Sequence, residues 1–171
     1  MNSNAYFMIQ HCTISKAYEG ILLDTVNNSL IIDNNCSNNF ADGIWLNNGN
    51  NNKIIHNIVN YGDEGIALWD CNNTVIYQNS VNYHDDDGIV LDGKSSDNNV
   101  TQNDVMNSDY GIHIIGGSFN NITSNTVGNS KWRGIYLSSC HENLISSNVV
   151  NNSGQYGIYL WNVNDTYMIM S

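Results

Sequence analysis

The feature that most constrains the fold of this 171-residue chain is an internal repeat of 22 or 23 residues. The dipeptide Gly-Ile recurs seven times, at Gly20, Gly43, Gly65, Gly88, Gly111, Gly134 and Gly157. Each pair is followed after one residue by Leu or Ile, and this alternation with a period of two indicates a short strand with one buried face. Since one repeat of this length cannot bury its apolar face alone, we expect the repeats to stack.

A second signature lies about eleven residues after each of the first six Gly-Ile pairs and has the form Ile/Val-x-x-Asn-x-Val/Cys. Its six asparagines are Asn34, Asn57, Asn79, Asn103, Asn125 and Asn148. An inward Asn at a corner of the coil can bond to its own backbone and to the Asn of the next coil, so we expect these residues to form a ladder. The glycine before each Ile indicates a corner that needs either a positive φ or a close approach of two backbones.

The composition favours strands and turns over helices. The chain contains 33 Asn and no Pro, and only 12% of its residues are charged. Asn competes with the backbone for hydrogen bonds and favours turns over helix interiors. The leucine-rich repeat has a similar period and its own Asn ladder, but it usually needs a helical segment, and the stretches between the two signatures are poor in helix formers. A solenoid built of strands is therefore the expected fold class.

The two signatures together resemble the parallel β-helix repeats of the pectin-lyase-like superfamily. They are most similar to its NosD-like branch of carbohydrate-binding and sugar-hydrolase proteins. The resemblance extends over about residues 5–171. It implies an all-β, single-stranded, right-handed parallel β-helix of about seven rungs, a rung being one turn of the coil, with three parallel sheets and no evident caps. It says little about activity, because the repeat reflects the geometry of the coil.

The charge balance excludes one class of partner. Five Lys and Arg residues stand against 16 Asp and Glu residues, which gives a net charge of −11. Such a chain offers no basic patch for nucleic acid or for an anionic membrane. It also contains no apolar run as long as a membrane span, so membrane insertion is not expected.

The outward positions of the first strand, two and four residues after each Gly, are rich in large aromatic side chains. The residues there that we predict to bind carbohydrate are Trp45, Trp69, His113, Tyr136, Tyr159 and Trp161. Sugar rings stack on flat aromatic side chains, and a spacing in multiples of the rung distance suits an extended polysaccharide lying along the solenoid. Aromatic stacking that only stabilises the sheet is the alternative explanation.

A column of acidic residues lies immediately before the first four of these glycines, and like charges on neighbouring rungs repel each other. We predict Ca²⁺ as a candidate cofactor, because hard oxygen ligands favour this ion. The candidate ligands are Asp63, Glu64, Asp86 and Asp87. A solvated acidic rim without a metal ion is the alternative.

The densest cluster of reactive groups is the run from Tyr83 to Gly88. The candidate catalytic residues within it are His84, Asp85, Asp86 and Asp87. Carboxylates on neighbouring rungs can meet the spacing that glycoside hydrolases need, and the resemblance implies lyases and epimerases that pair an acidic Ca²⁺ site with a proton acceptor. The catalytic sequences of polygalacturonases and pectate lyases are not recognisable here, and the uniform rungs leave no inserted loops to wall a cleft. We therefore expect binding in preference to catalysis.

The four cysteines are not expected to form disulfides. Cys12 and Cys36 fall on neighbouring rungs, in a ladder position and an inward position, while Cys71 and Cys140 are assigned to an outward turn column. Roughly 14 Å of solenoid separates the latter pair, well beyond the limit of about 7 Å between the Cα atoms of a disulfide.

The predicted function is that of an extracellular or cell-surface structural and binding module for an extended polysaccharide. Residues 1–171 are predicted to form one β-helix domain, either a segment of a longer solenoid or a unit that stacks head to tail. A Ca²⁺-assisted polysaccharide lyase, epimerase or glycoside hydrolase is the first alternative, and a self-assembling fibre subunit is the second. Nucleic acid is not an expected partner.

Overall fold

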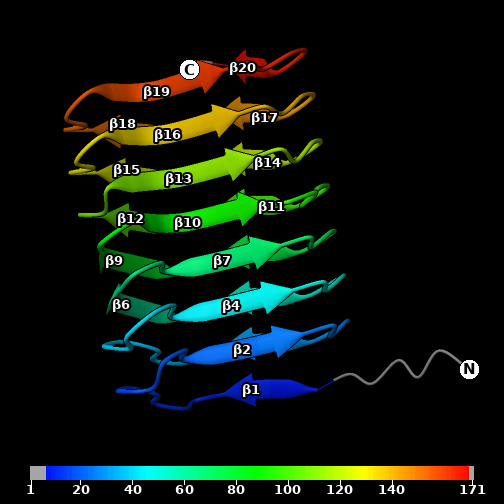
Figure 1. Ribbon diagram of the computed structural model, residues 1–171, viewed down its shortest axis with the longest axis vertical. Helices are drawn as coiled ribbons and strands as arrows, with labels where there is room; N and C mark the ends of the chain where they lie inside the picture. The colour runs from blue at the N-terminus through cyan, green and yellow to red at the C-terminus, as the bar shows by residue number, and fades with distance from the viewer. Residues whose placement is uncertain (1–6, 170–171) are drawn as a thin grey trace, which may run out of the picture.

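A computed structural model describes residues 7–169 of the chain and confirms the predicted all-β solenoid with three parallel sheets. The strands stack in rungs from the N-terminal to the C-terminal end (Figure 1). The eight-stranded sheet contains β1 (Met8–Gln10), β3 (Leu30–Ile32), β5 (Lys53–Ile55), β8 (Val75–Tyr77), β11 (Asn99–Thr101), β14 (Asn121–Thr123), β17 (Leu144–Ser146) and β20 (Tyr167–Ile169). Within residues 7–169 no helix occurs and every strand belongs to one of the three sheets, so no separate capping element is present there.

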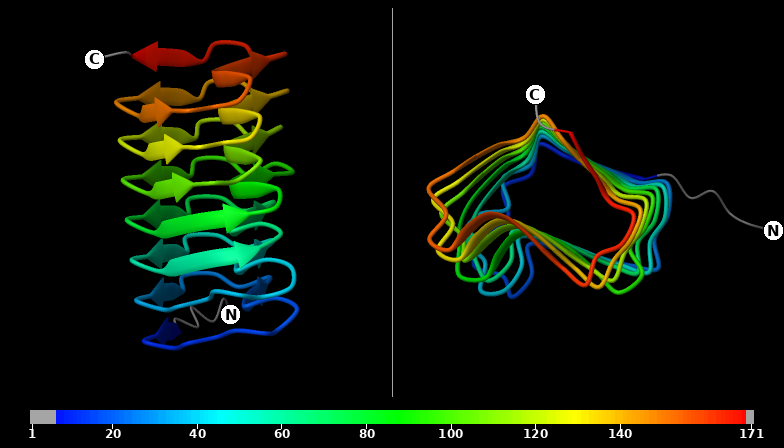
Figure 2. Two further views of the ribbon diagram at one scale, coloured as in Figure 1. Left: turned by 90° about the vertical axis from the view of Figure 1, so that its left-hand side faces the viewer. Right: turned by 90° about the horizontal axis from the view of Figure 1, so that it is seen from above.

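The other two sheets complete each rung. The seven-stranded sheet contains β2 (Ile21–Asp24), β4 (Ile44–Asn47), β7 (Ile66–Trp69), β10 (Asp87–Asp92), β13 (Tyr110–Ile115), β16 (Arg133–Ser138) and β19 (Tyr156–Trp161). The five-stranded sheet contains β6 (Ile58–Gly62), β9 (Ser80–His84), β12 (Asp104–Met106), β15 (Thr126–Gly128) and β18 (Val149–Asn151). Seen along the axis, the traces of successive rungs lie over one another (Figure 2).

The core consists of columns of identical or similar side chains. Each strand of the seven-stranded sheet pairs in parallel with the equivalent strand of the next rung, so that Ile66 lies between Ile44 and Ile89. All three side chains are completely buried. The repeat of the sequence is thereby converted into a continuous apolar interior in which every rung supplies the surface that its neighbour needs.

The repeated glycines are required by close approach of the backbone and not by a positive φ. Only Gly93 and Gly116 have a positive φ among the glycines of the described chain, and neither belongs to a Gly-Ile pair. A Cβ placed on Gly134 would lie 2.6 Å from the carbonyl oxygen of Gly157 and 2.8 Å from Oγ of Ser153. The glycines therefore allow neighbouring rungs to stack at this corner.

The six asparagines of the second signature form a continuous ladder of hydrogen bonds at another corner. The backbone N and Nδ2 of Asn57 donate to Oδ1 of Asn79 at 2.8 and 3.0 Å, and Nδ2 also donates to the carbonyl oxygen of Ile31 at 3.0 Å. The same pattern joins each Asn to the next, from Asn34 to Asn148. Five links thus satisfy the polar groups at a turn buried in the solenoid.

A second Asn ladder, which the sequence analysis missed, occupies a further corner. The backbone N of Asn98 donates to Oδ1 of Asn120 at 2.9 Å, and that of Asn120 donates to Oδ1 of Asn143 at 2.9 Å. These three side chains are fully buried. Their spacing of 22 and 23 residues was the available signal, although the column is interrupted in the rung below by Thr74 before Asn52 occupies it again with the same kind of bonds.

The assignment of Cys71 and Cys140 to an outward column was wrong. Both side chains are buried inside a corner, and Sγ of Cys71 accepts a hydrogen bond from the backbone N of Gly49 at 3.3 Å. The four cysteines are free, as expected. Burial raises the pKa of the Cys36 thiol to about 12 and that of Cys140 to about 11, so both remain protonated.

Candidate functional site

A groove of about 620 Å³ runs over the outward face of the seven-stranded sheet. Its hollow follows from side-chain size along one outward column, in which Trp45, Ala67, Val90 and His113 are aligned in register. The small residues Ala67 and Val90 stand between two large ring systems, and all four residues line the groove. The depression therefore arises because two successive outward positions carry small side chains.

The two sides of the groove differ in chemistry. Trp69, at the C-terminal end of β7, is 48% exposed and lines one side together with Asp92, its neighbour in register on β10, whereas Trp45 lies in the outward column beside Ala67. The other side is lined by acidic residues just before, or at the start of, the strands: Glu19, Asp42, Asp63, Glu64, Asp86 and Asp87. The fold thus gathers aromatic rings and a wall of carboxyl groups around the same groove.

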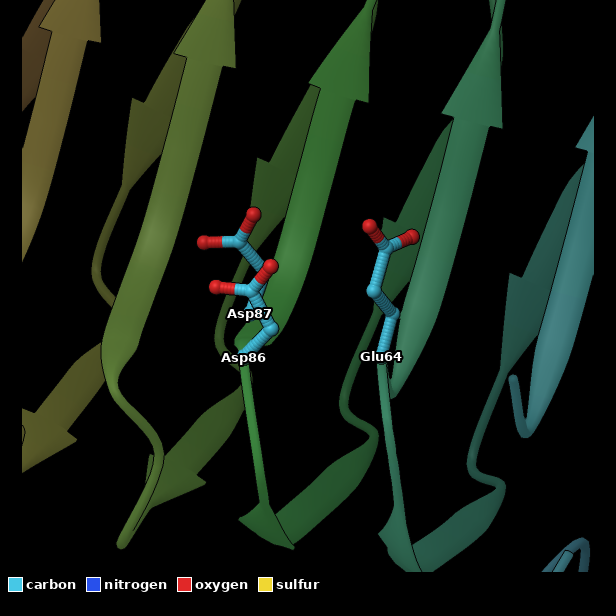
Figure 3. Close-up of side chains that lie close together, drawn as sticks. All are labelled: Glu64, Asp86 and Asp87. Carbon is cyan, nitrogen blue, oxygen red and sulfur yellow. The ribbon is translucent and has the colours of Figure 1, made fainter. Parts of the chain in front are cut away.

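Three carboxyl groups of this wall converge. Glu64, Asp86 and Asp87 each offer an oxygen within 4.8 Å of the others, and their side chains project from two neighbouring rungs (Figure 3). Asp63, also predicted as a ligand, lines the groove but is not a member of this cluster. Oδ1 of Asp87 is buried and has no hydrogen-bond partner among the described residues.

The crowding changes the acidity of these groups. Burial, reinforced by the charges of Asp42 and Asp87, raises the pKa of Glu64 to about 8. Burial and the charge of Glu19 raise the pKa of Asp42 to about 7. The pKa of Asp86 and that of Asp87 are raised as well, in both cases mainly by burial. Part of the wall is therefore protonated near neutral pH.

The imidazole of His113 compensates one of these carboxyl groups. Its Nδ1 lies 3.3 Å from Oδ2 of Asp87, and both side chains are almost completely buried. The hydrogen bond from His113 lowers the pKa of Asp87 in opposition to the larger effect of burial. His113 belongs to the outward column, so the pair joins the acidic wall to this column at the end of the groove that lies in the rung of β13.

The six aromatic residues predicted to bind carbohydrate separate into two groups. Trp45, Trp69 and His113 line the groove, whereas the other three do not. Tyr136 and Tyr159 stack around the guanidinium of Arg133, which lies 4.5 and 4.6 Å from their ring centroids. Trp161 is 55% exposed at the end of β19. The aromatic face is therefore a groove followed by an Arg–Tyr stack.

Two of the predicted catalytic residues lie away from the groove. His84 is 3% exposed, and its Nε2 lies 3.0 Å from the carbonyl oxygen of Val59. Burial lowers the pKa of His84 and favours the neutral ring. Asp85 is exposed and does not line the groove. Only Asp86 and Asp87 of that run belong to the site.

Sequence reasoning missed two contributions to the site. Tyr110 lines the groove and its ring lies 5.4 Å from that of His113. Its register with Asp87 in the next rung was the available signal. Ala67 and Val90 were placed on the outward face by the repeat, but their small size was not recognised as the origin of a groove.

Comparison with known proteins identifies the fold. The family described as "Right handed beta helix region" matches residues 1–138. No curated protein matches the chain significantly. The described residues also contain no helix that is long and apolar enough to cross a membrane.

Solved structures agree with this family. The chain is similar to the periplasmic alginate epimerase AlgG, with 18% identity, a TM-score of 0.78, and coverage of 96% of this chain and 51% of that chain. It resembles the A-module of the mannuronan C-5 epimerase AlgE4 of Azotobacter vinelandii, with 13% identity, a TM-score of 0.70, and coverage of 96% and 56%. It also resembles the tailspike protein gp49 of Pseudomonas phage LKA1, with 13% identity, a TM-score of 0.60, and coverage of 95% and 31%. The chain thus spans about half the length of the epimerases, and these identities show the fold alone.

Proposed function

The chain belongs to the right-handed β-helix family, and on that premise we propose that it binds an extended polysaccharide in the groove of its seven-stranded sheet. The observation that carries the proposal is that Trp45 and Trp69 line the same groove as a wall of carboxyl groups. Aromatic faces stack on sugar rings, and carboxyl groups hydrogen-bond to sugar hydroxyls. We place this activity in an extracellular or cell-surface protein; one structural neighbour is described as periplasmic.

The dimensions of the groove suit a chain of sugars. Its lining extends from Glu19 in the rung of β2 to Ile115 in the rung of β13. Five rungs at a spacing of about 4.8 Å correspond to a length of roughly 19 Å between the first and the last. A polysaccharide lying along the axis therefore meets several rungs in succession.

The acidic wall sets a condition on the ligand. With a net charge of −11, the protein repels an anionic polymer unless carboxyl groups are protonated or a cation intervenes. The raised pKa of Asp42 and that of Glu64 make protonated carboxyls available as hydrogen-bond donors below about pH 7. We expect a neutral polysaccharide to bind over a wide pH range and an anionic one to bind better at acidic pH.

Calcium fits the carboxylate cluster. Ca²⁺ takes six to eight oxygen ligands at about 2.3–2.6 Å, so two ligands on opposite sides of one ion lie up to about 5 Å apart. The 4.8 Å spread of Glu64, Asp86 and Asp87 meets this limit, and Oδ1 of Asp87 has no other partner among the described residues. These three residues would hold the ion, which would bridge the wall to carboxylates or hydroxyls of a ligand. Calorimetric titration with Ca²⁺, repeated on Asp87→Asn, tests the assignment; heat unchanged by the substitution would contradict it.

A glycan array tests the main proposal. The unaltered chain is expected to retain extended glycans, and a groove-filling variant, Ala67→Trp, is expected to lose them while the core stays intact. Retention by the filled variant would place the binding surface elsewhere. Failure of the unaltered chain to retain any glycan would reject the proposal.

A polysaccharide-modifying enzyme is the second candidate, and the Asp87–His113 pair favours it. A buried carboxyl hydrogen-bonded to an imidazole beside a substrate groove is an arrangement that can move a proton. Incubation with mannuronan in D₂O, followed by NMR, would detect deuterium at carbon from proton abstraction, and ultraviolet absorbance would detect unsaturated products. Binding without either signal, and without shortened products, would exclude an enzyme that acts on mannuronan and leave the binding module.

A further inference from the structure

Tyr61 and Tyr83 occupy a corner position that later rungs fill with asparagine. In register with Tyr83, the following rungs carry Asn107, Asn129 and Asn152, and these positions share a left-handed backbone with φ of 59°, 54° and 53°. The three asparagines form an outer ladder, in which Nδ2 of Asn129 donates to Oδ1 of Asn107 and Nδ2 of Asn152 donates to Oδ1 of Asn129, each at 3.2 Å. Asn is therefore the residue that the coil itself favours at this corner.

The two tyrosines adopt the same backbone at a greater cost. Their φ values are 61° and 65°, in a region that Asn tolerates and that is unfavourable for a bulky side chain. Burial does not compensate, because the side chains remain 51% and 50% exposed. The rings stack on each other, with centroids 5.0 Å apart and an interplanar angle of 10°. This contact offsets only part of the conformational free energy that the left-handed backbone costs. Other side chains share this backbone at corners of the chain, Phe119 and His56 among them, so the tyrosines are set apart because two exposed rings occupy one corner on neighbouring rungs and stack on each other.

The location of this pair connects it to the groove. Tyr61 directly precedes the turn that carries Asp63 and Glu64, and Tyr83 precedes the turn that carries Asp86 and Asp87. The two turns are held together, since the backbone N of Asp86 donates to the carbonyl oxygen of Asp63 at 3.1 Å. The tyrosines do not line the groove themselves. They therefore stand beyond the acidic wall, on the side away from Trp69.

We propose that Tyr61 and Tyr83 form a second sugar-stacking platform, which takes units of a polysaccharide that leaves the groove across the acidic wall. Exposed Asp63 and Asp85, two residues after each tyrosine, supply hydrogen-bond acceptors for sugar hydroxyls beside the rings. The class of ligand rests on the proposed function. Because the platform lies beside the rungs of β7 and β10, in the middle of the groove, a ligand that lies along the groove reaches it only with further units that turn aside across the acidic wall.

The test replaces the tyrosines with the residue that the coil favours. Tyr61→Asn and Tyr83→Asn are expected to raise the melting temperature by roughly 2–4 °C each, because they relieve strain. Affinity electrophoresis in gels containing mannuronan or hydroxyethyl cellulose is expected to show at least a fivefold loss of affinity for the polymer that the unaltered chain binds. Affinity for the matching trisaccharide, which fits within the groove, is expected to stay within twofold.

A reverse substitution provides the control. Asn129→Tyr puts the same side chain at the same corner two rungs above the platform, and it should lower the melting temperature without changing affinity for the polymer. A loss of stability in Tyr61→Asn and Tyr83→Asn with unchanged polymer affinity would overturn the inference, because it would show a structural role. If these variants bind the polymer normally while Trp69→Ala does not, the inference fails and the proposed function stands. If the unaltered chain binds neither polymer and retains no glycan on the array, both fail.

Discussion

Asp87 and His113, on neighbouring rungs of the outward face, form a nearly buried pair with Nδ1 of His113 3.3 Å from Oδ2 of Asp87. The imidazole also stacks on Tyr136, with ring centroids 4.3 Å apart. The pair therefore couples the acidic wall of the groove to the aromatic column. It lies where the lining of the groove and the stability of the sheet depend on the same contacts.

His113→Phe keeps a ring against Tyr136 but removes the hydrogen-bond donor of Asp87. A buried acceptor left without its partner costs about 1–3 kcal/mol, so we expect the free energy of unfolding to fall by that amount at pH 7. Urea denaturation measures the change. Adding Asp87→Asn should recover part of the loss, and equal stability of His113→Phe and the unaltered chain would show that the pair contributes nothing.

The acidic wall predicts that the protein loses stability as the pH rises. Burial raises the pKa of Asp42 from 3.8 to about 7 and that of Glu64 from 4.5 to about 8, so the folded state holds protons that the unfolded state has released. This contribution is complete below about pH 4 and is lost progressively up to about pH 8. The urea concentration at the midpoint of unfolding should therefore decrease as the pH is raised from about 4 to about 8.

Glu64→Gln should flatten this pH profile, because the amide cannot lose a proton. Asp104→Asn, on an exposed position of the five-stranded sheet, is the matched control and should leave the profile unchanged. A midpoint that rises with pH in the unaltered chain would mean that a bound cation or a different set of groups controls the wall.

The repeated glycines predict a position-dependent response to an added methyl group. In Gly134→Ala the Cβ would meet the carbonyl oxygen of Gly157 at 2.6 Å, whereas in Gly157→Ala it would meet only Cγ1 of Val150 at 3.8 Å. We expect the first substitution to cost about 1–3 kcal/mol and the second to be nearly neutral. The melting temperatures of the two variants test this prediction. If both variants lose the same stability, the close stacking of rungs is not the reason for glycine at this corner.

The inner Asn ladder predicts a large loss in Asn79→Ala. The side chain of Asn79 accepts from Asn57 and donates to Asn103 and to the carbonyl oxygen of Ile54. Since several buried groups lose their partners, we expect a cost of about 3 kcal/mol or more. Asn129→Gly, which removes an exposed ladder residue and keeps the left-handed backbone accessible, should cost less than about 1 kcal/mol. Similar losses in both variants would contradict a special role of the inner ladder.

Most of the fold could be predicted from the sequence because almost every rung repeats the same Gly-Ile and Asn signatures. Alternation after Gly43 or Gly65 identifies which side chains enter the core, and the period identifies their neighbours. The corners were harder to predict. Left-handed residues such as Asp70 and Gln78 redirect the chain there, so the alternation of the strand no longer tells inside from outside. Cys71 was placed wrongly for this reason.

The site was predictable only in part. The column of acids and the outward tryptophans followed from the repeat, as did the register that aligns Asp87 with Tyr110. The groove itself depends on missing volume at Ala67 and Val90, which no motif marks. The burial of His84 against Val59 likewise depends on the path of the turn.

Two tryptophans at the same position of the repeat give the most direct test of polysaccharide binding in the groove. Trp69 and Trp161 both stand four residues after the Gly of a Gly-Ile pair and are 48% and 55% exposed, but only Trp69 lines the groove. In affinity electrophoresis against the bound polysaccharide, Trp69→Ala should weaken binding about tenfold, which is about 1.4 kcal/mol, and Trp161→Ala should leave it unchanged. Equal affinities of the two variants, or a loss confined to Trp161→Ala, would contradict the assignment of the groove as the binding site.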